Sequence, residues 1–487
     1  MAEAGAAVAA GGVNMVLVTG ASGYVAAHVT QQLLRAGYRV RGTVRSLENK
    51  AKVEPLRNLC PDAKHQLELV EADLLKPDSW KAAVEGCSHV IHIASPFPSE
   101  RPRDEKEVIE PAVQGTTSIL KACQEVGNVK RVVLTSSIVA VSGGTGMEPN
   151  HVYSEADWPD LAAIGPYEKS KTLAEKAAWD FIENLKEEEK FELAVVNPGF
   201  VMGPMLSGST CTSMEVPKKL LMREIPLLPK LNFGFVDVRD VAAAHIKAMT
   251  VPEAAGNRHV LVGGNLWFRE VALILEREFK SQGYSIPTLV APKIGVQFFS
   301  LFDSSIKLIL PFIGKITLYN NTRMTKVLGI QPYSLEDTLV DMAYSIIERG
   351  FVPKKAKYRG PKKVDKEAAV EESNKGMEAA AVSPPAPSVD SAATTSANAA
   401  NDTPGKSVTS EPVEAAEAKK EAPVQENKTK EDKNQDGPVP AADDVPGTGK
   451  SDPAEAAETE QETPAQDNTK EDKNQDESAP AQEEHKD

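Results

Sequence analysis

The sequence predicts an α/β fold in which a doubly wound parallel sheet carries helices on both faces. Short apolar runs alternate with longer amphipathic stretches from Met15 to Pro198, and this alternation is typical of right-handed β–α–β crossovers. The first run, residues 15–19, reads MVLVT, as expected for a strand that is buried on both faces. The chain after Pro198 is less regular and richer in Pro and Met, which favours a smaller lobe beside the sheet.

Six strands and three long helices are expected before Pro198. We place the strands at residues 15–19, 38–44, 67–71, 89–94, 131–136 and 193–197. The first helix follows the first strand and stops before Gly37, because glycine is common just past a helix end. The other two cover about residues 104–126 and 167–184.

The composition changes sharply near residue 353. Residues 361–487 contain no Phe, Trp, Tyr, Leu or Ile, and they hold 30 acidic and 14 basic residues. Such a stretch cannot bury enough apolar surface to offset its chain entropy. We therefore expect a disordered acidic tail over residues 353–487, in which the octapeptide TKEDKNQD occurs twice, and a flexible N-terminus over residues 1–14. The tail is either a solubilising extension or a contact for a basic partner that is not known.

The remaining bulk features exclude several classes of function. Residues 1–360 hold 40 acidic and 41 basic residues, so no basic surplus indicates nucleic acid. The spacing of the four cysteines matches no zinc site or disulfide framework, which predicts no metal and a cytoplasmic protein with reduced thiols. The most apolar late segment, residues 296–314, is interrupted by charges and a proline. It favours a buried or pocket-lining helix over a membrane span, with a membrane-surface contact as the alternative.

The first strand runs directly into the string TGASGYVA at residues 19–26. Gly20 permits a tight turn, Gly23 lets the backbone approach a pyrophosphate at the helix N-terminus, and Ala26 allows close packing of helix on strand. This string between a strand and a helix predicts a Rossmann-type dinucleotide site, with an ordinary turn as the alternative. The candidate residues of the turn are Gly20, Ser22, Gly23, Tyr24 and Val25.

The end of the second strand indicates which dinucleotide binds. Enzymes that use NAD commonly carry an acid there for the ribose 2′-hydroxyl, but this strand ends in Arg45, with Lys52 further on. A guanidinium pairs well with a 2′-phosphate, so we expect NADPH/NADP+; a solvated basic loop is the alternative. Asp73 and Leu74 after the third strand, and Ala94 and Ser95 after the fourth, are further cofactor candidates.

Three residues predict a proton-transfer site. The fifth strand ends beside Ser137, and Tyr167 and Lys171 lie four residues apart on one face of the following helix. Transfer of a hydride to a carbonyl creates an alkoxide that needs a proton. A tyrosine supplies it best when a nearby ammonium lowers its pKa from about 10, and a serine hydroxyl can polarise the carbonyl oxygen. A second match to the same spacing, Tyr358 and Lys362, contains Gly and Pro and is interpreted as chance.

The strings VTGASGYVA, GTVRS, EADLL, HIASP, LTSSI, YEKSKTLAEKAAWDF, NPGFVMGP and FVDVRDVAAAHI cover about residues 15–350. Together they resemble the extended short-chain dehydrogenase/reductases, in the branch of dihydroflavonol 4-reductase, cinnamoyl-CoA reductase and NADPH-dependent carbonyl reductases. The resemblance implies that Ser137 holds the carbonyl, Tyr167 donates the proton, and Lys171 binds the nicotinamide ribose. Pro198, Gly199, Phe200 and Val201 would line the nicotinamide side, and Tyr167 and Lys171 would also belong to the cofactor-binding residues.

The resemblance also implies a division of the chain. The cofactor domain would comprise about residues 15–198 and 235–262, and the substrate lobe about 199–234 and 263–352. Asp240 is interpreted as a helix cap.

The sequence departs at two places from the patterns of the plant reductases in this branch, so we predict the substrate only as an aldehyde or ketone in general. Ser142 stands where plant dihydroflavonol reductases carry Asn or Asp, and residues 163–167 lack the NWYCY motif of cinnamoyl-CoA reductases. Other readings stay open: a hydroxysteroid dehydrogenase, a sugar-nucleotide epimerase, or a non-catalytic dinucleotide sensor or scaffold that acts through the tail. We expect a monomer or a homodimer.

Overall fold

The computed structural model describes residues 15–96, 104–144, 151–206, 208, 210–300 and 309–361. The expected flexible N-terminus and the expected disordered tail beyond Pro361, with its repeated octapeptide, lie outside the described residues. Within the described part, none of the helices is both long and apolar enough to span a bilayer.

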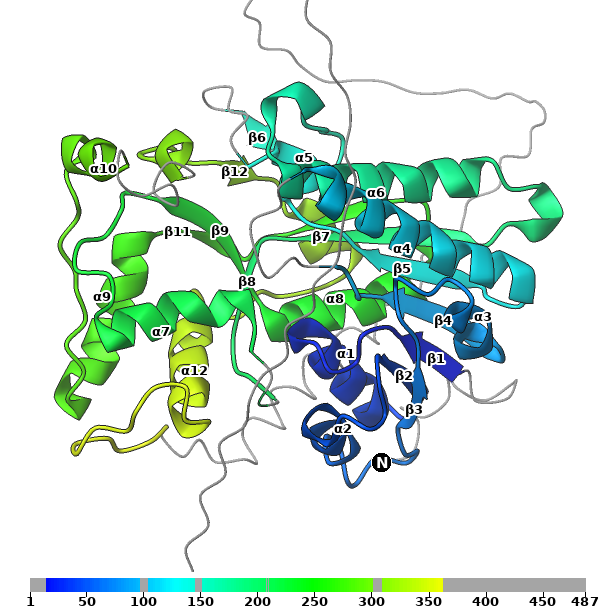
Figure 1. Cartoon of the computed structure of the whole chain (residues 1–487), viewed down its shortest axis with the longest axis horizontal. Helices are drawn as coiled ribbons and strands as arrows, with labels where there is room; N and C mark the ends of the chain where they lie inside the picture. The colour runs from blue at the N-terminus through cyan, green and yellow to red at the C-terminus, as the bar shows by residue number, and fades with distance from the viewer. Residues whose placement is uncertain are drawn as a thin grey trace, which may run out of the picture. The chain divides into compact units, whose positions relative to one another are not determined.

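The central feature is a parallel sheet, which the described residues build from seven strands (Figure 1) in the order β10-β7-β5-β4-β1-β2-β3. The strands are β1 (Met15–Val18), β2 (Arg39–Val44), β3 (Glu68–Glu71), β4 (Cys87–His92), β5 (Arg131–Thr135), β7 (Glu192–Pro198) and β10 (Arg258–Leu261). The α/β prediction is confirmed, and the six expected strands are present. The seventh, β10, was not predicted, and it pairs with β7 at the edge of the sheet.

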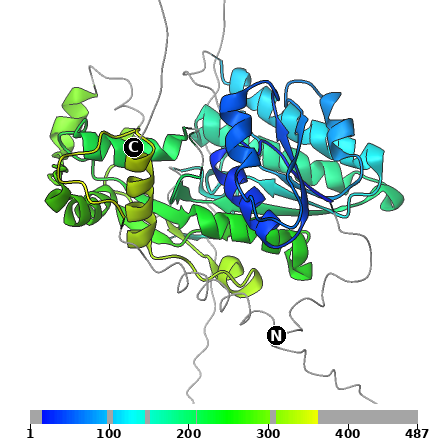
Figure 2. The same cartoon turned by 90° about the horizontal axis from the view of Figure 1, so that it is seen from below.

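Helices cover both faces of this sheet (Figures 1 and 2). Helices α1 (Tyr24–Arg35) and α8 (Val238–Thr250) pack on one face, while α3 (Ser79–Val84), α4 (Lys106–Val126) and α6 (Pro166–Glu183) pack on the other. Because successive side chains of a strand point to opposite faces, Val16 and Val18 join the core under α1, whereas Leu17 joins the core under α4. Helix α2 (Lys50–Arg57) follows β2.

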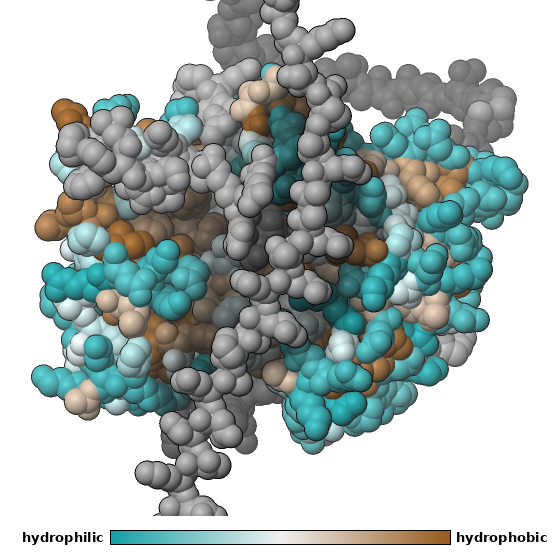
Figure 3. Space-filling model, in the orientation of Figure 1, coloured by the Kyte–Doolittle hydropathy of each residue, from teal (hydrophilic) through white to brown (hydrophobic). Residues whose placement is uncertain are grey.

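The chain after Pro198 builds a smaller lobe around the three-stranded sheet β11-β9-β8. Its elements are β8 (Phe200–Met202), α7 (Glu215–Met222), β9 (Asn232–Asp237), β11 (Gly264–Trp267), α9 (Phe268–Phe279), α10 (Lys293–Phe299) and α12 (Leu335–Glu348). Figure 3 shows apolar residues on the surface of this lobe, where Leu289 and Ile294 are exposed. The short strands β6 (Val152–Tyr153) and β12 (Leu318–Tyr319) pair with each other.

Three details differ from the sequence-based expectations. Strand β9 belongs to the small sheet, so the chain returns to the cofactor domain with α8 at Val238 rather than at residue 235. The carboxylate of Asp237 accepts the N–H of Arg239 and caps α8, whereas Asp240 accepts the N–H of Tyr333. The role of helix cap therefore belongs to Asp237, which lies at the end of β9 where the helix begins.

The third difference concerns residues 353–361, which the sequence assigned to the tail. The Tyr284 hydroxyl donates to the carbonyl of Pro353 over 3.0 Å, and the Tyr358 hydroxyl donates to Glu348 over 2.7 Å. The Arg359 N–H donates to the side chain of Gln282 over 3.1 Å. These contacts join the segment to the smaller lobe and give Tyr358 a structural role.

Candidate active site

The turn between β1 and α1 has the geometry of a phosphate cradle. Gly20 has a φ of +64°, and a Cβ atom added there would lie 3.1 Å from the Cβ of Ala94. Gly23 is the N-cap of α1 and provides no side-chain cap, and the first turn of the helix holds no acidic residue. The N–H groups at this helix start therefore suit an anion, and the residues present fit the pyrophosphate of a dinucleotide.

Thr19 joins this turn to the end of β4, a feature that the sequence analysis did not single out. Its hydroxyl accepts the N–H groups of Ile93 and Ala94, both over 2.9 Å, and lies 2.9 Å from Nδ1 of His92. Burial lowers the pKa of His92 to about 3, so the ring is neutral. Since both lone pairs of the hydroxyl accept N–H groups, its hydrogen points to Nδ1. Thr19 thus holds Ile93 and Ala94 beside the turn.

Arg45 lies directly after β2, beside the turn. The N–H of Ala21 donates to the carbonyl of Thr43 over 2.9 Å, which holds the end of β2 against the glycine string. The loop after Arg45 is anchored because Glu71 accepts the N–H of Leu47 over 2.7 Å. Arg45 is exposed, and no ion pair joins it to another described residue. Its position fits a phosphate on the 2′-oxygen of a ribose.

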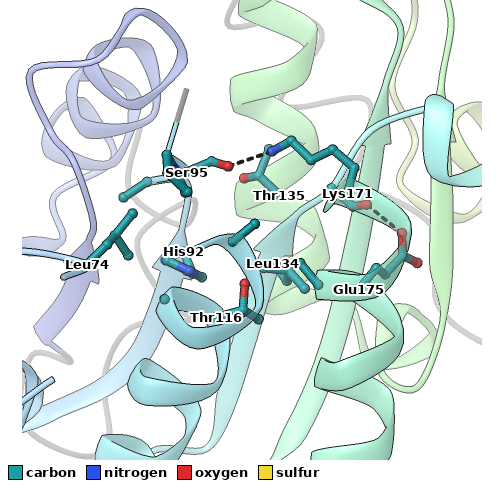
Figure 4. Close-up of a pocket in the computed structure, with 14 residues that line it drawn as sticks. Leu74, His92, Ser95, Thr116, Leu134, Thr135, Lys171 and Glu175 are labelled. Atoms are coloured by element: carbon teal, nitrogen blue, oxygen red, sulfur yellow. Dashed lines mark hydrogen bonds between the residues drawn. The ribbon is translucent and has the colours of Figure 1, made fainter. Parts of the chain in front are cut away.

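The other cofactor candidates line the same edge of the sheet. The carboxylate of Asp73 accepts the N–H of Leu75 over 3.0 Å and shapes the turn after β3. Leu74 packs on Gly115 of α4, where an added Cβ would lie 3.0 Å from its side chain. Leu74, Ser95 and Lys171 line one pocket at the carboxyl ends of β4 and β5 (Figure 4). Lys52 is exposed on α2, where its N–H is capped by the Asn49 side chain.

Ser137 and Tyr167 meet at the carboxyl end of β5. Tyr167 is the second residue of α6, which begins at Pro166, a residue well suited to the first helical position. The side chains of Ser137 and Tyr167 are hydrogen-bonded. Burial raises the pKa of Tyr167 above its usual value, the neighbouring carboxylate of Glu168 raises it further, and the bond from Ser137 lowers it. Tyr167 as a whole residue is 36% exposed, although its phenolic hydroxyl lies in a desolvated environment.

Lys171 lies one helical turn further along α6. Its ammonium donates to the hydroxyl of Ser95 over 2.8 Å, as Figure 4 shows, and burial lowers its pKa to about 8. From the sequence we expected Lys171 to lower the pKa of Tyr167. The structure shows a raised pKa instead, because burial of the phenol dominates and the ammonium points to the end of β4. Of the predicted trio, Ser137 lies just after β5, and Tyr167 and Lys171 lie on α6.

The segment 198–201 connects the sheet to the smaller lobe beside this site. The carbonyl of Pro198 accepts the N–H of Ile138 over 3.0 Å, which ties the end of β7 to the chain after Ser137. Gly199 must be glycine, because a Cβ there would lie 2.5 Å from the carbonyl oxygen of Gly234.

The side chains beyond Gly199 belong mainly to the smaller lobe. The ring of Phe200 packs against Phe233 and Phe235, with centroids 5.7 and 5.5 Å away. Val201 is partly buried beside the core of the larger domain. Ser142 is buried and bonds to the hydroxyl of Tyr319 over 2.9 Å, so it packs in the core.

Comparison with known proteins agrees with this geometry. The NAD dependent epimerase/dehydratase family model matches residues 16–263. Cinnamoyl-CoA reductase CAD2 of Medicago truncatula is 39% identical over 273 residues, which cover 55% of this chain and 82% of the plant protein. The structure of Gre2 from Candida albicans in complex with NADPH is 32% identical, with a TM-score of 0.57, and the match covers 69% of this chain and 99% of that chain.

A second solved structure is similar to the same extent. Yeast methylglyoxal/isovaleraldehyde reductase Gre2, complexed with NADPH, is 30% identical with a TM-score of 0.57, and the match covers 69% of this chain and 98% of that one. These matches span the sheet, the turn and the smaller lobe, and they confirm the resemblance drawn from the sequence strings. The chain belongs to the NAD dependent epimerase/dehydratase family and is related within it to NAD(P)-dependent reductases.

Proposed function

We propose that this protein reduces an aldehyde or ketone to an alcohol with NADPH, through Ser137, Tyr167 and Lys171. The observation that carries the proposal is the hydrogen bond between Ser137 and Tyr167 at the carboxyl edge of the sheet, one helical turn from Lys171. This is the edge at which ligands bind in open α/β sheets. Two of the relatives described above are reductases by name, the cinnamoyl-CoA reductase CAD2 and the methylglyoxal/isovaleraldehyde reductase Gre2.

The two hydroxyl groups have complementary roles in the proposed reaction. Bound NADPH supplies the hydride that adds to the carbonyl carbon. Ser137 donates a hydrogen bond to the carbonyl oxygen, which stabilises the negative charge that develops there. Tyr167 delivers its phenolic proton to the same oxygen and completes the alcohol. Burial raises the pKa of Tyr167, so the phenol carries this proton at neutral pH and is ready to donate it.

Lys171 supplies positive charge to the same site. Its ammonium lies on the same face of α6 as Tyr167 and within reach of Ser95 at the end of β4. From there it would bind the ribose hydroxyls next to the nicotinamide. When the proton leaves Tyr167, the ammonium also stabilises the phenolate by Coulomb attraction.

The proposed preference for NADPH rests on Arg45. It follows β2 without an acidic neighbour before Glu48, and it is exposed beside the glycine turn. Both Gre2 structures described above hold NADPH. We also place the protein in the cytoplasm, because its four cysteines are free thiols and disulfides persist mainly in oxidising compartments.

The test is NADPH oxidation against a panel of aldehydes and ketones, with Tyr167→Phe as the variant. We expect turnover of at least one carbonyl by the wild type and a loss of roughly a hundredfold or more in Tyr167→Phe, since proton donation contributes about 10²–10⁴ in rate. The matched control is Tyr358→Phe, which removes a hydroxyl in the smaller lobe and should keep wild-type turnover. Equal turnover of Tyr167→Phe and the wild type would refute the proposed role.

A further inference from the structure

A buried ion pair lies directly beneath the candidate active site. Glu175 of α6 is 1% exposed and Arg258 of β10 is 7% exposed. The guanidinium Nε donates to Oε1 of Glu175 over 2.5 Å. The two residues are 83 positions apart in the sequence, and they join the helix that carries Tyr167 and Lys171 to the strand at the edge of the sheet.

The second oxygen of Glu175 reaches the strand that leads to Ser137. Ser136 donates its hydroxyl to Oε2 over 2.5 Å, and the Asn197 amide donates to the same oxygen over 2.8 Å. That amide also donates to the carbonyl of Ser137 over 3.2 Å. The carboxylate thus holds the backbone on both sides of the Ser137 side chain, through its neighbour Ser136 and through Asn197 on β7.

Arg258 is held just as firmly on its far side. Its guanidinium donates to the carbonyls of Asp157 and Ala140, over 2.6 and 2.8 Å, and lies 3.8 Å above the ring of Trp158. Its position, and that of the carboxylate it binds, is therefore fixed by the surrounding chain.

The spacing along α6 gives this arrangement a functional meaning. Tyr167, Lys171 and Glu175 follow one another every four residues and so lie along one side of the helix. Whatever sets the axial position and rotation of Glu175 also sets those of the phenol and the ammonium. Stability alone explains the pair poorly, because replacing a buried ion pair by apolar residues of similar volume is often neutral or stabilising.

We propose that Glu175, with Arg258 as its counterion, is a positioning residue that fixes the phenol of Tyr167 relative to the hydroxyl of Ser137. The inference rests on the proposed function, since it assigns roles to those two groups. A displacement of about 1 Å between reacting groups can cost about a hundredfold in rate, so the loss of this contact should act on turnover.

The experiment compares three variants of the full chain. Glu175→Gln keeps the shape of the side chain and removes its charge. The double variant Glu175→Gln/Arg258→Met removes both charges, so that no unpaired guanidinium remains buried. The matched control is Glu192→Gln, which breaks the ion pair between Arg131 and Glu192. These two residues begin β5 and β7, at the end of each strand that is farther from Ser137. Each protein is measured for Tm, for the Kd of NADPH by fluorescence titration, and for kcat and KM with the best carbonyl of the panel.

We expect Glu175→Gln to lower kcat at least tenfold, to change the KM of the carbonyl less than threefold, and to raise the Kd of NADPH severalfold through Lys171. In the double variant we expect Tm to return toward the wild-type value while kcat stays low and the Kd of NADPH stays high. Glu192→Gln should keep wild-type kcat and Kd. A purely structural role predicts instead that kcat and Tm recover together in the double variant, and that result would overturn the inference.

Two further outcomes are distinguishable. Wild-type kcat and Kd in Glu175→Gln would also overturn the positioning role, while leaving the proposed function intact. If the wild type reduces no carbonyl, the proposed function fails by itself. The Kd of NADPH then decides the inference: a severalfold rise in Glu175→Gln that persists in the double variant supports it, and an unchanged Kd refutes it.

Discussion

The cofactor preference of this enzyme should depend on one side chain, Arg45. In the structure it follows β2 directly and is exposed beside the glycine turn that we propose for the pyrophosphate. A hydrogen bond to a charged group contributes about 1.5–3 kcal/mol, and solvent exposure places Arg45 at the lower half of that range. Since 1.4 kcal/mol corresponds to a factor of ten, Arg45→Ala should lower kcat/KM for NADPH roughly ten- to thirtyfold.

The same substitution should leave kcat/KM for NADH nearly unchanged, because that cofactor has no 2′-phosphate. The assay is the ratio of the two kcat/KM values at constant ionic strength, since salt screens exposed charges. Arg39→Ala is the matched control: Arg39 is an exposed arginine at the other end of the same strand, and its loss should not alter the ratio. An unchanged ratio in Arg45→Ala, or an equal change in both variants, would refute this reasoning.

Three further predictions follow from the structure. Burial lowers the pKa of Lys171 to about 8, so kcat/KM for NADPH should fall as the pH rises through 8 and the ammonium is lost; a flat profile up to pH 9.5 would contradict this role. Four buried histidines should make the fold sensitive to acid, because burial lowers their pKa values to between about 3 and 4. They are His28, His92, His245 and His259. Above pH 6.5 they are neutral in both states. As the pH falls below 6.5, only the unfolded chain binds protons, so each should cost about 1.4 kcal/mol of unfolding free energy per pH unit. Urea midpoints at pH 7, 6 and 5 measure this loss, and constant midpoints would exclude it. Finally, a chain that ends at Pro361 should keep full turnover and Tm, whereas one that ends at Val352 should have a lower Tm because it lacks the contacts of Tyr358 and Arg359; equal Tm values would show that those contacts are unimportant.

Local patterns were sufficient to predict the parallel sheet and to select candidate site residues at the ends of its strands. The glycines after β1, Arg45 after β2 and Tyr167 at the start of α6 each depend on a few neighbouring residues, so their spacing and their position at strand ends were readable. The parallel sheet was predictable for the same reason, because its inner strands are short apolar runs between helices.

The missed features depend on residues far apart in the sequence. Strand β10 reads RHVL. Because it begins with an arginine and a histidine, the sequence does not indicate a buried strand there. Arg258 is accommodated there only because Glu175, on another element, supplies the charge and the hydrogen bond. The predicted direction of the pKa shift at Tyr167 was likewise wrong. The sequence shows that Lys171 follows four residues later, but it does not show that the folded chain buries the phenol.

In the proposed reaction, hydride passes to a carbonyl carbon while Tyr167 protonates its oxygen. The most direct measurement is a single turnover with NADPH deuterated at the transferable position, with the best carbonyl of the panel and mass analysis of the product. We predict that the wild type forms an alcohol with one deuterium at the former carbonyl carbon, and that Tyr167→Phe forms it at least about a hundredfold more slowly. NADPH that binds but keeps its deuterium with every carbonyl tested, or equal rates in the two proteins, would contradict the claim.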